Sequence, residues 1–268
     1  MRDLKGVFLD IFGGVGGVAK SASALGAHAE VWDTSFGNEY DLARPRVLRR
    51  LLHRIRKGNI LGAAIAMPCK SFSLARARRG AIRTKLWPWG IPEILESGDG
   101  RDFDDLIEGN LVLKATIKII QELNKRQIPW VWENPLTSYA GHVAQLQRAR
   151  IQAHGFVSVI DQCSCGTPWK KPTQLWFGNW KNWTWASSKT ILLDAAVSAV
   201  RAASAVVNMS FSRAAIEPGQ PRFTRKSFVN FLRAGSCPEP HTPNIDFMVM
   251  RDPVIVPEIS DEISKGPL

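Results

Sequence analysis

Cys69 is the residue whose surroundings best suit covalent chemistry. It follows the apolar run 60–66 within Met67-Pro68-Cys69, and Lys70 stands beside it. A cysteine at the end of a buried strand can be accessible, and a neighbouring cation lowers the pKa of a thiol and so enlarges the nucleophilic thiolate fraction. We interpret Cys69 as a candidate nucleophile, and the alternative is a buried structural cysteine.

Glu133 is a second candidate, because it ends the apolar run 129–133 and precedes Asn134-Pro135. Burial at a strand end disfavours the charged carboxylate and raises its pKa, which suits a group that holds or donates a proton near neutral pH. A carboxylate occupied by backbone donors is the alternative.

A glycine-rich turn, Gly-Gly-Val-Gly-Gly at positions 13–17, follows the apolar run 7–10 and precedes an Ala- and Ser-rich segment. Glycines let the backbone turn sharply and approach a ligand, and a following helix N-terminus offers free N–H groups. Asp33 closes the next strand-like run, where an acid accepts hydrogen bonds from ribose hydroxyls. The pattern predicts a nucleoside-containing cofactor. A ligand-free turn and helix capping by Asp33 are the alternatives.

These turns belong to a chain that we expect to fold as an α/β domain. Strand-like runs lie at 7–10, 29–32, 60–66, 129–133 and 156–161, and segments of helical character lie at 18–25, 47–56, 104–125 and 143–154. Their alternation predicts a mostly parallel sheet with right-handed crossovers. Because ligands bind outside the carboxyl ends of such strands, the three turns should meet at one edge.

The pattern changes after this domain. We predict three parts: a catalytic domain at 1–165, a small Trp- and Lys-rich lobe at 166–236, and a Pro-rich, loosely ordered tail at 237–268. We expect most tryptophans of the lobe to fill its core, and stacking on nucleic-acid bases is the alternative. Within the first domain, the turn-rich stretch 76–100 is interpreted as a long functional loop.

The charge balance indicates a polyanionic partner. Lys and Arg number 35 against 24 Asp and Glu, which gives a formal net charge of +11. The cations gather in two runs, 44–57 and 70–85, as expected for phosphate contacts; a solubilising surface charge is the alternative. We expect nucleic acid to contact Lys70, Ser73, Arg76, Arg78, Arg79, Lys170 and Lys171.

No apolar run is long enough to span a membrane, and the N-terminus does not resemble a signal peptide, so we expect a soluble, intracellular monomer. The four cysteines (69, 163, 165 and 237) do not form the pattern of a secreted disulfide framework, which favours a reducing compartment, either cytoplasm or nucleus. Zinc binding by the last three with His241 is disfavoured by the tight Cys-x-Cys spacing, and we predict no metal site.

The order of these motifs resembles that of the DNA cytosine-C5 methyltransferases, from about Leu4 to Gln162. The stretch 8–17 is similar to their S-adenosylmethionine (SAM) motif, 68–73 to their catalytic Pro-Cys motif, and 133–135 to their Glu-Asn motif, with Pro where Val is usual. The resemblance implies a Rossmann-like, SAM-dependent methyltransferase acting on C5 of cytosine, with DNA preferred over RNA. The cofactor-binding residues that it implies are Asp10, Phe12, Gly13, Gly14, Gly16, Gly17, Asp33 and Asp41. For Asp41, an ordinary turn aspartate is the alternative.

The resemblance also implies a mechanism. Cys69 adds to C6 of a flipped-out cytosine, which makes C5 nucleophilic enough to accept the methyl group. Glu133 contacts N3 and the exocyclic amine, while Pro68 and Asn134 hold the geometry. The residues do not identify the base that removes the C5 proton.

Two departures from the family keep other functions open. Its Gln-x-Arg-x-Arg stretch is replaced at 162–166 by Gln-Cys-Ser-Cys-Gly, so Lys170 and Lys171 are the remaining phosphate-binding candidates there, and a C-terminal Gly-Asn motif is not recognisable. One alternative is a non-catalytic, nucleic-acid-binding relative of the same fold. Another is a dinucleotide-dependent oxidoreductase, which rests on Gly14-x-Gly16-x-x-Ala19 alone.

Overall fold

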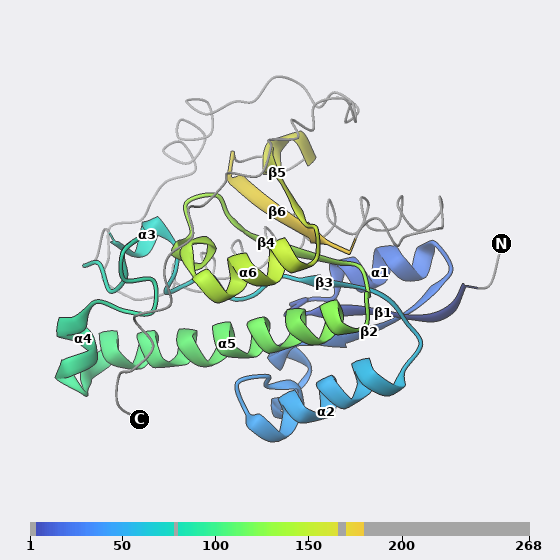
Figure 1. Ribbon diagram of the computed structural model, residues 1–268, viewed down its shortest axis with the longest axis horizontal. Coiled ribbons are helices and arrows are strands. Elements are labelled where there is room, and N and C mark those ends of the chain that lie inside the picture. Colours follow the sequence, from blue (N-terminus) through green and yellow to red (C-terminus); the bar gives the residue numbers. More distant parts are fainter. Residues whose placement is uncertain (1–3, 78–79, 166–169, 180–268) are drawn as a thin grey trace, which may run out of the picture.

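The computed structural model describes residues 4–77, 80–165 and 170–179 (Figure 1). The predicted tail at 237–268 and most of the predicted lobe at 166–236 lie outside these residues, as do Arg78 and Arg79.

Six strands form one sheet in the order β2-β1-β3-β4-β6-β5. The strands are β1 (Leu4–Ile11), β2 (Ala27–Trp32), β3 (Ile60–Ile65), β4 (Trp130–Pro135), β5 (Phe156–Asp161) and β6 (Pro172–Gly178). Strands β1 to β4 are parallel, and β6 runs antiparallel to both β4 and β5. The predicted α/β class with a mostly parallel sheet is therefore confirmed.

Strand β6 is the element that differs from the prediction. The sequence assigned its residues to the C-terminal lobe, whereas they pair with β4 from Trp130↔Gly178 to Pro135↔Thr173. Trp176 packs against Trp132 of β4, with ring centroids 4.7 Å apart. This part of the Trp-rich region belongs to the core of the main sheet.

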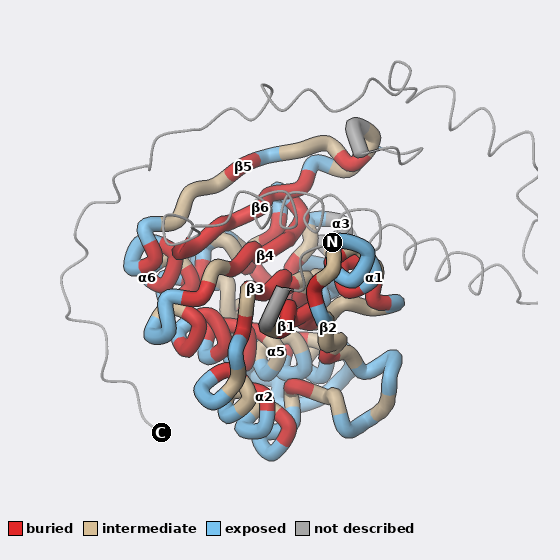
Figure 2. The backbone as a smooth tube through the Cα atoms, turned by 90° about the vertical axis from the view of Figure 1, so that its right-hand side faces the viewer, coloured by how far each residue is buried: buried red, intermediate tan, exposed pale blue. Residues whose placement is uncertain are grey.

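Helices cover both faces of the sheet. They are α1 (Gly17–Ala24), α2 (Pro45–Lys57), α3 (Leu74–Ala77), α4 (Pro92–Ser97), α5 (Gly100–Lys125) and α6 (Ala144–Gln152), with short 3₁₀ turns at Thr34–Phe36, Asn38–Tyr40, Tyr139–His142 and Gln162–Cys165. Helix α1 shares a core with Phe8 and Val131, while α2, α5 and α6 pack on the opposite face, around Leu9 and Trp132. Figure 2 shows the central strands mostly buried and the outer sides of these helices exposed.

Helix α2 illustrates why the sequence produces these elements. Val47, Leu51 and Ile55 recur every four residues and are all buried, and Pro45 occupies the first turn, where its missing N–H costs nothing. Among the described residues, no helix is both long enough and apolar enough to cross a membrane.

The packing of α2 predicts a contrast between two substitutions on that helix. Leu51 is 0% exposed, so Leu51→Ala should lower the free energy of unfolding by about 2–5 kcal/mol through lost burial and a residual cavity. The exposed His53 serves as the control, since His53→Ala should change it by less than about 0.5 kcal/mol. Urea unfolding followed by circular dichroism measures both, and equal effects would contradict this packing.

Candidate active site

The carboxyl edge of the sheet collects the turns that the sequence singled out. The chain passes from β1 to β2 on one side and returns to β3 on the other, so the strand order reverses at β1. Ligands bind in open α/β sheets at such a switch point, outside the carboxyl ends of the strands. The glycine turn follows β1, Asp33 follows β2, Cys69 follows β3 and Glu133 lies near the end of β4. Because β6 is antiparallel, Lys171 enters at the same edge.

Asp10 supports the glycine turn from inside the protein. It is 2% exposed, and its Oδ2 accepts a hydrogen bond from the backbone N–H of Ala19 at 2.9 Å. A Cβ on Gly13 would lie 2.4 Å from the Asp10 carboxyl group, so only glycine fits there. Burial raises the pKa of Asp10 from 3.8 to about 6, although the Ala19 N–H opposes this shift. Asp10 therefore supports the conformation of the glycine turn.

The turn itself has the backbone conformation that favours glycine. Gly14 has φ +53° and Gly16 has φ +72°, and α1 begins at Gly17. Phe12 also has a positive φ, and its side chain packs against the core beneath the turn. The turn leaves the first N–H groups of α1 at the carboxyl edge, where a ligand can accept from them.

Asp33 ties the end of β2 to this turn. Its Oδ2 accepts from the N–H of Gly14 at 3.0 Å and its Oδ1 from the N–H of Ser35 at 2.8 Å, while the Ser35 hydroxyl donates to the Gly14 carbonyl at 2.8 Å. Each carboxylate oxygen has a second lone pair, so the half-buried Asp33 can both cap the Thr34–Phe36 turn and accept from a ligand.

Asp41 is engaged locally. One oxygen accepts from the N–H of Ala43 at 3.0 Å and the other from Nε of Arg44 at 3.0 Å. These are the contacts of a turn aspartate, which is the alternative that the sequence left open.

Cys69, Glu133 and Lys171 form the chemical centre of this edge. Lys171 Nζ lies 3.9 Å from Glu133 Oε1, and that oxygen is buried without a hydrogen-bond partner among the described residues. Burial raises the pKa of the Cys69 thiol; Lys171 opposes this shift and Glu133 adds to it. Burial also raises the pKa of Glu133, again opposed by Lys171. The three groups therefore influence one another electrostatically.

The cation that lowers the pKa of the Cys69 thiol is not the one that the sequence suggested. We expected its neighbour Lys70 to lower the thiol pKa, but Lys70 Nζ pairs with Asp105 of α5 at 2.7 Å, and desolvation dominates. The cation that acts on Cys69 is Lys171, which is 102 positions away in sequence. Cys69 is a free thiol, whereas Cys163 is disulfide-bonded, which differs from the expectation of reduced cysteines.

Asn134 and Pro68, the sequence neighbours of Glu133 and Cys69, differ in their burial. Asn134 follows Glu133 on β4 and therefore points to the opposite face, where it is fully buried. Neither its Nδ2 nor its Oδ1 has a partner among the described residues. Pro68 is exposed at the turn beside Cys69.

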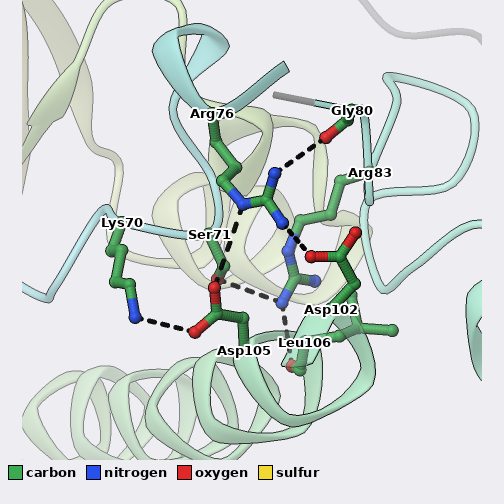
Figure 3. A network of polar contacts seen from close by, with 8 residues as sticks. All are labelled: Lys70, Ser71, Arg76, Gly80, Arg83, Asp102, Asp105 and Leu106. Atoms are coloured by element: carbon green, nitrogen blue, oxygen red, sulfur yellow. Dashed lines mark hydrogen bonds and ion pairs between the residues drawn. The ribbon is translucent and has the colours of Figure 1, made fainter. Parts of the chain in front are cut away.

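The loop after Cys69 is docked onto α5 by its own basic residues (Figure 3). Arg83 is 1% exposed; its Nη2 donates to the Leu106 carbonyl at 3.0 Å and to the Ser71 hydroxyl at 3.3 Å. Its guanidinium carbon lies 3.9 Å from the centroid of the Phe72 ring. Burial lowers the pKa of Arg83 to about 9. A residue that the sequence counted as part of a surface run is thus the internal anchor of the loop.

Several predicted nucleic-acid contacts are occupied within the protein. Arg76 pairs with Asp102 of α5, and Lys170 Nζ lies 3.4 Å from Asp161 Oδ2. The N–H of Ser73 donates to the Cys69 carbonyl at 2.9 Å, so Ser73 shapes the turn around the thiol. Within the second basic run, Lys70, Arg76 and Arg83 are therefore held by partners inside the protein, the first two by acids of α5.

Comparisons with known proteins add little to this geometry. No family model and no curated protein sequence matches the chain. Among solved structures, the chain is similar to a methyltransferase of Entamoeba histolytica, EhMeth, at 11% identity and a TM-score of 0.35 over 66% of this chain. The match spans 53% of that chain, about half of its length. The sheet topology described above defines the fold class as Rossmann-like α/β.

The Cys69 centre predicts opposite effects of its two charged neighbours on thiol reactivity. Glu133→Gln removes a negative charge and should speed alkylation of Cys69 by iodoacetamide at pH 7.5, whereas Lys171→Met should slow it and displace its pH profile to higher pH. Peptide mass spectrometry of timed reactions measures both rates. Lys70→Met is the control and should leave the profile unchanged, because Lys70 pairs with Asp105. A response to Lys70 and none to Lys171 would contradict the arrangement.

The burial of Asp10 predicts a pH dependence of stability. Between pH 3.8 and about 6 the native state holds a proton that the unfolded state releases, so the free energy of unfolding should fall as pH rises through this window. Asp10→Asn lacks the titration but keeps an acceptor for Ala19. The stability of the variant relative to the natural protein should therefore increase by on the order of 3 kcal/mol between pH 4 and pH 7. Urea unfolding at each pH measures this difference, and parallel curves would rule out a buried, titrating Asp10.

Proposed function

We propose that this protein transfers a methyl group from SAM to C5 of cytosine in nucleic acid, preferably DNA, through a covalent Cys69 adduct. The observation that carries the proposal is the grouping of a free thiol, a buried carboxyl group and a lysine at the sheet edge that also bears the glycine turn. Covalent catalysis at a pyrimidine needs a nucleophile that adds to C6 and a group that supplies a proton at N3.

The glycine turn and Asp33 fit the cofactor. The backbone of Gly14 and Gly16 bends with positive φ toward the N-terminus of α1, and Asp33 keeps lone pairs free for ribose hydroxyls. When bound, SAM supplies the electrophilic methyl group.

In this mechanism one proton moves between the Cys69 thiol and the Glu133 carboxyl group. At rest, burial keeps Cys69 protonated, and an ionised Glu133 disfavours the thiolate further. Passage of the thiol proton to Glu133 produces a thiolate and a neutral carboxylic acid, and this removes the repulsion between them. Lys171, 3.9 Å from the Glu133 carboxyl group, stabilises the negative charge wherever it resides.

The same proton then serves the substrate. The thiolate forms a bond to C6, and protonated Glu133 donates to N3, so that the electron pair released from the C5–C6 bond makes C5 nucleophilic. After the methyl group has passed from SAM to C5, loss of the C5 proton to a base restores the C5–C6 double bond as the C6–sulfur bond breaks and the thiolate leaves. N3 returns its proton to Glu133, which gives neutral 5-methylcytosine. The net charge of +11 supports a polyanionic substrate.

A 5-fluorocytosine substrate tests the mechanism directly, because fluorine does not leave C5 as a proton does. Incubation of an oligonucleotide containing it with the protein and SAM should yield an adduct that survives denaturation and maps to Cys69. Cys69→Ser should abolish the adduct, since a serine hydroxyl is scarcely ionised at neutral pH. Glu133→Gln should slow trapping by roughly a hundredfold or more, with SAM binding by calorimetry unchanged.

The controls separate the alternatives. An adduct on Cys163 would refute the site, and methylation that persists in Cys69→Ala would point to another target atom. SAM binding without adduct or methylation on any DNA or RNA would favour a non-catalytic relative. Binding of NAD in place of SAM would favour the oxidoreductase.

A further inference from the structure

A groove of about 470 Å³ lies along α5, and Cys69 is not among the residues that line it. Its walls come from α5, from the loop before α4 and from the start of α6, elements that lie side by side in Figure 1. The residues that give it chemical character are Trp89, Asn110, Lys114, Lys118, Gln121 and Gln145.

The groove carries uncompensated positive charge. Lys114 and Lys118 stand one helical turn apart on α5, both exposed, where like charges repel each other. Neither side chain forms an ion pair with the residues that the structure describes, and none of the described residues that line the groove is acidic. An anion placed between the two lysines would relieve this repulsion.

One wall is a tryptophan that the protein holds in place. Nδ2 of Asn110 donates to the Trp89 carbonyl at 2.8 Å, while Oδ1 of Asn110 accepts from Nη1 of Arg83 at 2.8 Å. Trp89 is half-buried against the core, so one part of its ring remains open. Trp87, 49% exposed, lies on the same loop but is not among the residues that line the groove.

We propose that this groove binds a single-stranded segment of nucleic acid, with phosphates at Lys114 and Lys118 and a base stacked on Trp89. A rigid aromatic ring beside paired cations is the combination that single-strand binding requires, because every base has a π-face and every linkage has a charge. The amides of Gln121 and Gln145 can donate to and accept from base edges. The class of occupant rests on the proposed function, whereas the charge and shape of the groove do not.

The loop connects this groove with the chemical centre. One segment begins at Cys69 and reaches Trp89, and Arg83 anchors both of its ends, through Ser71 near the first and through Pro88 and Asn110 near the second. The same anchor therefore helps to fix the positions of both the Cys69 turn and Trp89.

The test measures binding of a fluorescein-labelled 12-nucleotide oligothymidylate by anisotropy, without SAM, so that no adduct forms. Lys114→Glu with Lys118→Glu should raise the Kd by roughly tenfold at low salt and reduce the slope of log K against log salt by about 1.4, the value for two lost phosphate contacts on a single strand. The matched control is Lys20→Glu with Lys125→Glu, which changes the net charge equally at two other exposed positions and should alter Kd by less than about twofold. Trp89→Leu should also weaken binding by about tenfold.

Each result decides the proposal. An equal increase of the Kd in the two lysine double variants would show that net charge alone matters and would overturn the proposal. Absence of binding at low salt would also overturn it. So would a Kd for duplex DNA as low as that for the single strand. Free thymidine monophosphate that competes as well as the oligonucleotide would replace a strand site by a nucleotide site. Unchanged thermal unfolding of the lysine variants verifies that they fold. Loss of SAM binding or of the Cys69 adduct would refute the proposed function while leaving this binding result intact.

Discussion

The buried guanidinium of Arg83 joins the loop that follows Cys69 to helix α5. A cation removed from water is costly unless its donors are satisfied. Arg83 satisfies its terminal nitrogens with the carbonyls of Pro88 and Leu106 and the side chains of Ser71 and Asn110, and its flat face rests on the Phe72 ring. Because these partners belong to both the loop and α5, Arg83 fixes the loop against the helix from inside, and the ion pairs of Lys70 and Arg76 with α5 add to this at the surface.

Little space is left around the Arg83 guanidinium for additional side-chain atoms. A Cβ on Gly109 of α5 would lie 2.2 Å from the Ser71 hydroxyl and 2.9 Å from Arg83 Nη2, so the helix must present a glycine where the loop docks. Phe72 is fully buried, and its carbonyl accepts from the N–H of Tyr139, which links the loop to the segment after β4. The turn that carries Cys69 is in this way connected to both strands that border it.

Desolvation is the second organising effect, and it acts on the residues at the carboxyl edge. Asp10, Cys69 and Glu133 all have raised pKa values because the sheet removes them from water. Lys171 lowers the pKa values of Cys69 and Glu133 and so opposes the effect of burial. Lys171 lies beside them because β6 runs antiparallel to β4, which places the start of β6 next to the end of β4. The chemistry of the edge is thus a balance between burial, which favours neutral forms, and one cation, which favours the anion.

The sequence by itself determined the period of each element and the residues at the strand ends. Alternation of apolar runs located the strands from β1 to β5, and the four-residue spacing of Val47, Leu51 and Ile55 located α2, because these patterns reflect which side chains must leave water. Only the tertiary structure decided the partners of the charges. Arg83, Lys70 and Lys171 look alike in the sequence as exposed cations, yet one is buried, one is paired with α5 and one faces Glu133. Strand β6 was missed because its residues were interpreted as part of a Trp- and Lys-rich lobe, and only the tertiary structure showed that they pair with β4 from Trp130↔Gly178 to Pro135↔Thr173.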